Sequence, residues 1–173
     1  SSVKRPEMIL IDSAYVNYDS DINMLKKLSD SGINLIFCNL PDFKVINGNT
    51  ELMNLLGISV SIQENATLSG IRLYSGFLLG GSRWYVKEED PDGTYQDMDL
   101  NVSWYIAGTG TKTYMSGVLD NTTYGTTKNE NLPAIIWRKS TGNAYVFAVN
   151  GDYMKEDTGI GILYSMVSEM KAE

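Results

Sequence analysis

The chain contains 173 residues, 43% of them hydrophobic, which is enough for one domain with a sizeable core and argues against intrinsic disorder. Its formal net charge is -7 and it has no run of Lys or Arg, so we expect no nucleic-acid partner. The single cysteine, Cys38, excludes an internal disulfide and a cysteine-based zinc site. No stretch is long and apolar enough to cross a bilayer, and we expect no membrane insertion by this segment.

The first residues, Ser-Ser-Val-Lys-Arg, include neither an initiator methionine nor the apolar core of a signal peptide. We therefore expect the chain to be a fragment of a longer multidomain protein, with neighbouring domains of the same polypeptide as its partners. Many exported bacterial proteins avoid cysteine, and the abundance of Asn, Thr, Tyr and Gly suits an extracytoplasmic surface. These features favour an extracellular or cell-envelope location.

The first elements predict a strand-helix-strand unit. The segment Glu7–Asp12 places four consecutive apolar residues before a polar stop, which is typical of a strand buried on both faces. Asp19 or Ser20 can cap the helix that follows, and Gly32 suits its left-handed end. Residues 33–40, "INLIFCNL", predict a second buried strand parallel to the first.

The pattern of apolar and polar residues changes in the middle of the chain. Asn49 or Thr50 can begin a short helix that Gly57 ends. From residue 58 to about 130, apolar residues alternate with polar ones between turns, which predicts a β-rich antiparallel insertion. Two further strands flank a turn at residues 141–143 and bring the chain back to the core.

The last element is a predicted helix that Thr158 can cap. Apolar residues at helical spacing predict the face it turns to the sheet: Ile160, Leu163, Tyr164, Val167 and Met170. The sequence therefore predicts one α/β domain over residues 1–173, built in three layers on a mainly parallel sheet, with the β-rich insertion over about 58–130.

The sequence contains no histidine. Ser-His-Asp and Cys-His-Glu catalysis both need a base that exchanges a proton near neutral pH, and imidazole normally fills that role. Histidine-ligated zinc is excluded by the same count, which leaves only an all-oxygen site for a hard cation. Cys38 lacks the small flanking residues of a nucleophile elbow, so we interpret it as a buried hydrophobic residue. We expect no catalytic residue, no metal and no cofactor.

Polar side chains follow the predicted core strands and define a candidate ligand-binding crevice formed by Asp12, Asn39, Asp42 and Asp152. Ligands of open α/β sheets bind beside the carboxyl ends of parallel strands, where these groups would converge if the strands are adjacent. Paired carboxylates can hydrolyse glycosides without histidine. The alternative interpretation is that each aspartate caps a turn or the start of a helix.

Aromatic residues are concentrated in the predicted insertion. Four of them form a candidate aromatic surface: Trp84, Tyr85, Trp104 and Tyr105. Planar rings on a sheet can stack on sugars or form a docking face for a neighbouring domain. Core packing of the insertion is the default interpretation, because aromatic residues lie mostly in interiors.

The chain resembles the class I glutamine amidotransferase-like domain in three stretches: "ILIDSAYVNYDSDINMLKKLSDSGINLIFCNLPD", "NTELMNLLGI" and "LPAIIWRKSTGNAYVFAVNGDYM" with its terminal helix. The match covers about the first 58 and the last 40 residues. It implies a flavodoxin-like scaffold. Catalytic members of that fold use a Gly-x-Cys-x-Gly elbow and a distant His-x-Glu, which this chain lacks, so the resemblance implies the scaffold without the activity.

More narrowly, the chain resembles a bacterial family whose members carry such a module beside a polysaccharide deacetylase-like domain in exported or surface proteins. This resemblance implies a non-catalytic accessory or binding module of a cell-envelope or secreted protein linked to polysaccharide processing, with polysaccharide as a further partner. A carboxylate-dependent glycan hydrolase and a protein-protein interaction domain are the alternatives.

Overall fold

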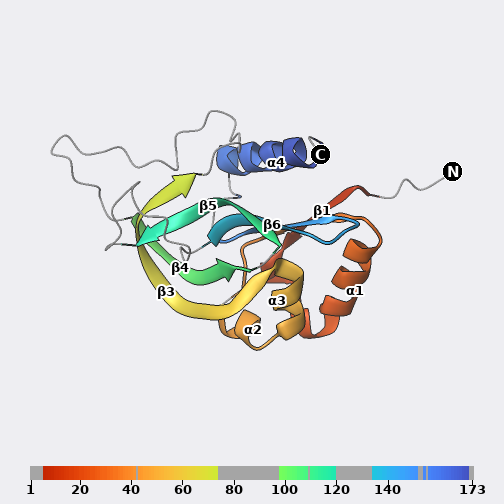
Figure 1. Cartoon of the computed structure of the whole chain (residues 1–173), viewed down its shortest axis with the longest axis horizontal. Helices are drawn as coiled ribbons and strands as arrows, with labels where there is room; N and C mark the ends of the chain where they lie inside the picture. The colour runs from red at the N-terminus through yellow and green to blue at the C-terminus, as the bar shows by residue number, and fades with distance from the viewer. Residues whose placement is uncertain are drawn as a thin grey trace.

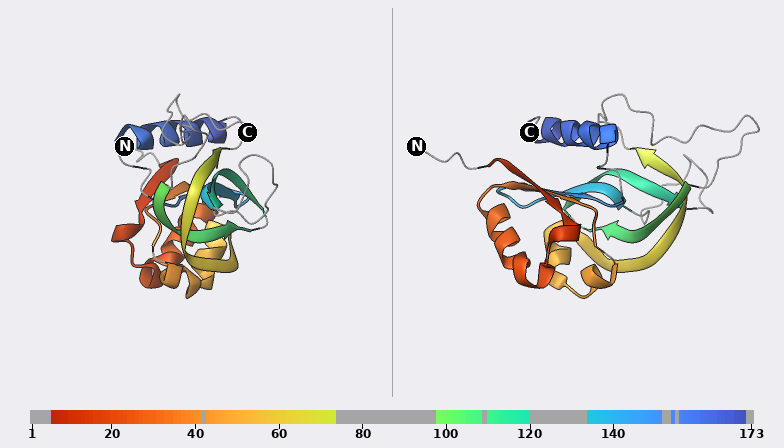
Figure 2. Two further views of the ribbon diagram at one scale, coloured as in Figure 1. Left: turned by 90° about the vertical axis from the view of Figure 1, so that its left-hand side faces the viewer. Right: turned by 180° about the vertical axis from the view of Figure 1, so that it is seen from behind.

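The computed structural model describes residues 6–41, 43–73, 98–108, 110–119, 134–151, 154 and 156–171. Its elements in chain order are β1 (Met8–Asp12), a 3-10 turn (Ser13–Tyr15), α1 (Tyr18–Asp30), β2 (Asn34–Cys38), α2 (Phe43–Asn47), α3 (Thr50–Leu56), β3 (Ile58–Leu73), β4 (Met98–Ala107), β5 (Thr111–Leu119), β6 (Ala134–Ser140), β7 (Tyr145–Val149) and α4 (Glu156–Lys171). One sheet separates α1, α2 and α3 on one face from α4 on the other (Figures 1 and 2). The three α/β layers expected from the sequence are present.

The seven strands lie in the order β1-β2-β7-β6-β5-β3-β4. Pairs β1-β2 and β2-β7 are parallel, whereas every other described pairing is antiparallel. The prediction of a mainly parallel sheet is therefore wrong for the sheet as a whole. The reason is connectivity: a short turn joins β6 to β7, which forces antiparallel pairing, whereas the β1-β2 connection contains α1 and permits parallel pairing.

The antiparallel character predicted for residues 58–130 is confirmed for β3, β4 and β5. These strands do not form a sheet of their own, because β5 pairs with β6 and so continues the sheet that begins at β1. Gly108 and Gly110 lie between β4 and β5.

Side-chain hydrogen bonds mark where the helices α1 and α3 begin. The helix α1 begins one residue before Asp19, so the predicted caps Asp19 and Ser20 lie inside it, and the carboxylate of Asp21 accepts a hydrogen bond from the Asn17 backbone N–H at 3.1 Å. At α3 the predicted cap is confirmed, because the Asn49 side chain accepts a hydrogen bond from the Leu52 N–H at 3.0 Å.

Each face of the sheet carries its own apolar core. Helices α1 and α3 pack on one face around Trp137, Leu52 and Phe37, and α4 covers the other face around Tyr114 and Phe147. Helix α4 is also tied to β5 by a carboxylate, since Glu169 Oε2 accepts hydrogen bonds from Lys112 Nζ at 3.2 Å and from the Tyr114 hydroxyl at 3.1 Å.

The face that α4 buries agrees with the predicted one only in part, because Leu163 and Met170 pack against the core as expected. Ile162 and Met166 are buried, whereas Ile160 and Tyr164 are 69% and 64% exposed. Thr158 is not the cap, because the helix begins at Glu156. Two apolar stripes run along this helix, and periodicity alone does not reveal which one the sheet covers. Among the described residues, no helix combines the length and apolar character that a membrane span requires.

Candidate functional site

Two of the four predicted crevice residues meet at the carboxyl ends of the first two strands. Asp12 ends β1, Asn39 follows β2, and the Asn39 Nδ2 donates a hydrogen bond to Asp12 Oδ1 at 3.4 Å. The backbone of Asn39 is left-handed, with φ of 52°, a conformation that asparagine tolerates better than most residues. The other two predicted residues, Asp42 and Asp152, lie outside the described residues, so their part in the crevice stays a prediction.

The Asp12 carboxylate has a local structural role. Its Oδ1 also accepts a hydrogen bond from the Ala14 backbone N–H at 3.0 Å, which caps the 3-10 turn after β1. This is the turn-capping interpretation of the sequence. The same oxygen therefore serves both the turn and Asn39, and it holds the carboxyl ends of β1 and β2 together.

A buried hydroxyl pair lies beside Asp12 and was not anticipated from the sequence. The Tyr18 hydroxyl donates a hydrogen bond to Ser13 Oγ at 2.6 Å, and the two residues are 4% and 5% exposed. Burial raises the pKa of Tyr18 to about 12, although the hydrogen bond with Ser13 lowers it in part. Because burial disfavours the charged phenolate, the Tyr18 hydroxyl keeps its proton at neutral pH and donates a hydrogen bond to Ser13.

This pKa predicts a loss of stability in alkali. The pKa of Tyr18 rises from 10.0 to about 12 on folding, so its contribution to stability is complete below pH 10 and is lost as the pH rises from 10 to about 12. Urea unfolding should show a smaller alkaline loss in Tyr18→Phe than in the wild type. At pH 7 this variant should cost about 1 kcal/mol, because Ser13 loses its partner. Identical alkaline losses in both proteins would contradict the assignment.

Cys38 is buried, as the sequence predicts, and its thiol donates a hydrogen bond to the Ile11 carbonyl at 3.4 Å. Burial raises the pKa of the thiol, and the negative charge of Asp12 raises it further. Because the thiolate is the nucleophile, this environment disfavours nucleophilic attack by Cys38.

A hollow of about 390 Å³ adjoins this cluster, lined by Ser13, Val16, Asn17, Tyr18, Asp19, Pro41 and Val45. Its polar groups are hydroxyls, one amide and one carboxylate. Within the part of the chain that the structure describes, no group of three or more Asp, Glu, Cys or His side chains is placed to hold a metal ion.

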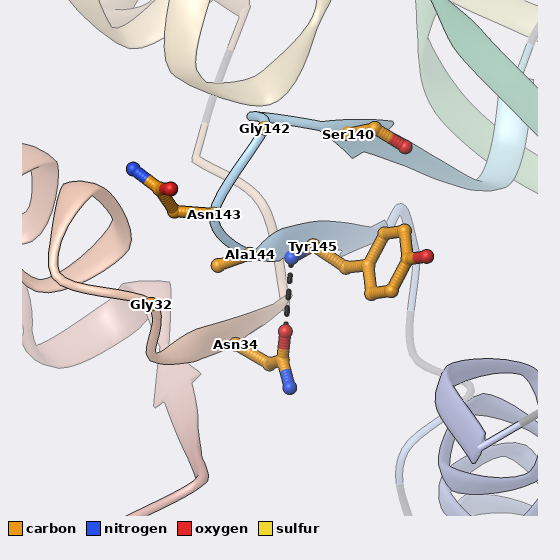
Figure 3. A pocket seen from close by; sticks show the side chains of 7 residues that line it. All are labelled: Gly32, Asn34, Ser140, Gly142, Asn143, Ala144 and Tyr145. Atoms are coloured by element: carbon orange, nitrogen blue, oxygen red, sulfur yellow. Dashed lines mark hydrogen bonds between the residues drawn. The ribbon is translucent and has the colours of Figure 1, made fainter. Parts of the chain in front are cut away.

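A second hollow, of about 320 Å³, lies at the opposite ends of the same strands (Figure 3). Its lining residues are Gly32, Asn34, Ser140, Gly142, Asn143, Ala144 and Tyr145. Asn34 begins β2 and Tyr145 begins β7, and Asn34 Oδ1 accepts a hydrogen bond from the Tyr145 backbone N–H at 2.9 Å. Sequence reasoning missed this site. The available signal was the pair of glycine turns at Gly32 and Gly142. They precede β2 and β7, which pair in parallel.

The candidate aromatic surface is only partly described. Trp84 and Tyr85 lie outside the described residues, and Trp104 and Tyr105 lie in β4, where they pair in register with Gln63 and Ile62 of β3. The surface therefore stays a prediction. One aromatic residue of the same stretch, Tyr114, is buried and stacks on Phe147 with ring centroids 6.2 Å apart. This position agrees with the interpretation that aromatic residues of the insertion pack in the core.

Comparison with known proteins gives likenesses of fold only. No protein-family model and no curated protein sequence matches this chain. The solved structure of β-galactosidase from Bacillus circulans sp. alkalophilus matches with a TM-score of 0.55 and 11% identity, over 95% of this chain and 23% of that chain. The β-galactosidase from Rahnella sp. R3 matches with a TM-score of 0.51 and 12% identity, over the same shares. The chain thus has a mixed α/β fold similar to a segment that makes up about a quarter of each of these two β-galactosidases.

Proposed function

We propose that this chain is a non-catalytic accessory or binding module of a bacterial cell-envelope or secreted protein that processes polysaccharide. The observation that carries the proposal is the fold likeness to β-galactosidases, which extends over 95% of this chain but only 23% of either enzyme. A chain that corresponds to a minor part of a glycoside-cleaving enzyme fits an accessory role beside a catalytic domain. We also propose an amidotransferase-like scaffold for its parallel part, β1-β2-β7, although β1 lies at the sheet edge and not inside it.

The chemistry at the carboxyl ends of β1 and β2 supports a non-catalytic role. The Asp12 carboxylate accepts two hydrogen bonds from its own surroundings, at 3.0 and 3.4 Å. The Cys38 thiol is buried and has a raised pKa, and the chain has no histidine to activate it. A binding role does not require an activated group, whereas acyl transfer from glutamine does.

A protein-protein interaction domain is the second candidate, and one observation favours it. Ile160 and Tyr164 project from α4 with 69% and 64% of their surfaces exposed, on the side of the helix that the sheet does not cover. Exposed apolar groups on one helix face are typical of surfaces that another protein covers. This candidate predicts binding to a neighbouring domain and no retention by polysaccharide.

Affinity electrophoresis tests the polysaccharide partner. We expect gels that contain soluble galactan, xylan or chitosan to retard the purified protein in at least one case, relative to a gel without polysaccharide. Migration that none of the three polymers changes would overturn the polysaccharide part of the proposal and favour the interaction domain.

A parallel assay tests the absence of catalysis. We expect no release of nitrophenol from p-nitrophenyl β-galactoside and no release of ammonia from glutamine. Glycoside cleavage that disappears in Asp12→Asn would instead establish the carboxylate-dependent hydrolase, with a second carboxyl group at about 5–10 Å from Asp12. Ammonia release that disappears in Cys38→Ser would establish amidotransferase chemistry.

A further inference from the structure

We propose that the hollow at the amino ends of β2 and β7 is a binding site for a small, uncharged sugar. This inference rests on the proposed polysaccharide partner and names where one sugar unit would bind. The hollow lies between the turn before β2, at Gly32, and the turn between β6 and β7, at Gly142 (Figure 3). Its volume of about 320 Å³ is at the lower end of the range of about 300–1,000 Å³ that small-molecule sites occupy.

The lining selects for an uncharged polar ligand. None of its seven residues carries a charge at neutral pH, in a chain whose formal net charge is -7. None of the seven lining side chains would supply a counter-charge to offset the loss of a charged ligand's hydration. A sugar hydroxyl is both donor and acceptor, so it can pair with the carboxamides and the hydroxyl that line this hollow.

Asn34 supplies a donor of fixed orientation. Its Oδ1 accepts a hydrogen bond from the Tyr145 backbone N–H at 2.9 Å. Because only the oxygen can accept this bond, the orientation of the carboxamide is fixed. The Nδ2 group is directed away from that hydrogen bond, as Figure 3 shows, and it has no hydrogen-bond partner among the described residues. Asn34 thus offers two N–H donors without the side chain having to reorganise.

Three other lining side chains add neutral polar and aromatic groups to the hollow. Asn143 donates from Nδ2 to the Asp30 carbonyl at 3.0 Å, which leaves its Oδ1 as an acceptor. Ser140 adds an exposed hydroxyl. The ring of Tyr145 is only partly buried, and the Arg138 guanidinium lies 4.5 Å from its centroid and restrains it. Aromatic rings of this kind can pack against the apolar C–H face of a sugar.

Two glycines keep the hollow open. Gly142 has φ of 90°, and a Cβ added there would meet no atom within 4 Å. Gly32 has φ of 88°, and the nearest neighbour of an added Cβ would be the Asn143 carbonyl oxygen at 3.4 Å. Because these positions favour glycine, both turns leave space for a ligand where a side chain would otherwise stand.

Nuclear magnetic resonance on the ¹⁵N-labelled protein tests the site. The Tyr145 backbone amide is a direct reporter, because it donates to the carboxamide whose nitrogen would bind the sugar. We expect methyl β-galactoside to shift the Tyr145 amide and the Asn34 side-chain amide signals. Galacturonate, which has the same ring with a negative charge, should bind about tenfold more weakly. Shifts confined to the hollow beside Tyr18, or equal binding of both sugars, would overturn the site.

The variant Asn34→Asp is the sharpest test. It keeps an oxygen to accept the Tyr145 N–H and nearly the same shape, but it removes both donors and adds a charge, so the Kd for methyl β-galactoside should rise about tenfold or more. The matched control is Asn17→Asp, which makes the same change at the other hollow and should leave binding unchanged. Equal Kd values for wild type and Asn34→Asp would overturn the site.

The polysaccharide gels separate this inference from the proposed function. If galactan retards the wild type and Asn34→Asp to the same extent, the sugar site is wrong and the accessory role stands. If no polymer retards the wild type but methyl β-galactoside binds at Asn34, the site stands as a sugar site and the polysaccharide role fails.

Discussion

Replacing Trp137 with alanine is expected to lower the free energy of unfolding by about 3–5 kcal/mol, the largest effect of any single change considered. Trp137 is fully buried in β6, and its indole Nε1 donates a hydrogen bond to the Leu56 carbonyl at 2.7 Å. Leu56 ends α3, so the indole binds a carbonyl that the helix itself cannot satisfy. Urea unfolding followed by far-ultraviolet circular dichroism would measure the loss.

The variant Trp137→Phe is the matched control, because it keeps an aromatic ring and removes the donor. It should cost less than Trp137→Ala but still about 1–3 kcal/mol, since the Leu56 carbonyl is left buried without its indole partner. If phenylalanine proved as stable as the wild type, the link between α3 and β6 would contribute packing alone. If it cost as much as alanine, the hydrogen bond would dominate.

Gly57→Ala is expected to be the second most damaging change, at about 2–4 kcal/mol. Gly57 follows α3 with φ of 71°, a conformation that costs any residue with a Cβ. The added Cβ would also lie 2.5 Å from the Thr111 Cγ2 and 3.2 Å from the Lys139 Cβ. Thr111 cannot readily turn its methyl group away, because its hydroxyl donates to the Gly108 carbonyl at 2.6 Å.

Gly142→Ala separates the two causes of that cost. Its φ of 90° brings the same kind of backbone strain, but its added Cβ meets nothing within 4 Å. This variant should therefore lose only about 1–2 kcal/mol in the same urea experiment. Equal losses in both glycine variants would show that contact with Thr111 contributes nothing.

The structure gives the two ends of the parallel strands different characters. At the carboxyl ends, Asp12, Cys38 and Tyr18 form hydrogen bonds within the protein and hold β1, β2 and the start of α1 together. At the amino ends, Asn34 lines a hollow and uses only its side-chain oxygen in this way. A binding module needs the second kind of arrangement, in which the donor is already oriented before the ligand arrives.

Elements governed by neighbours in the sequence were predictable. The strand-helix-strand unit of β1, α1 and β2, the left-handed glycines 32 and 57, and the Asn49 cap all follow from local periodicity and local backbone preference. The meeting of Asp12 and Asn39 was also expected, because both follow strands of one parallel pair.

Other features depend on contacts between distant residues. The buried stripe of α4 could not be chosen from the sequence, because Ile160 and Ile162 both lie on apolar stripes and only packing against β5, β6 and β7 buries the second. The hollow around Asn34 was equally hidden, since it exists only where the start of β2 meets the start of β7, more than a hundred residues later.

The sequence by itself determined the α/β class, the order of the elements around β1 and β2, and the lack of histidine chemistry. Each of these depends on composition or on residues a few positions apart. The tertiary structure alone decided that the sheet is mostly antiparallel, that Asp12 caps a turn, and that an uncharged hollow lies beside Asn34. The physical reason is that strand pairing and burial depend on contacts between segments far apart in the chain. A local sequence pattern does not predict these contacts.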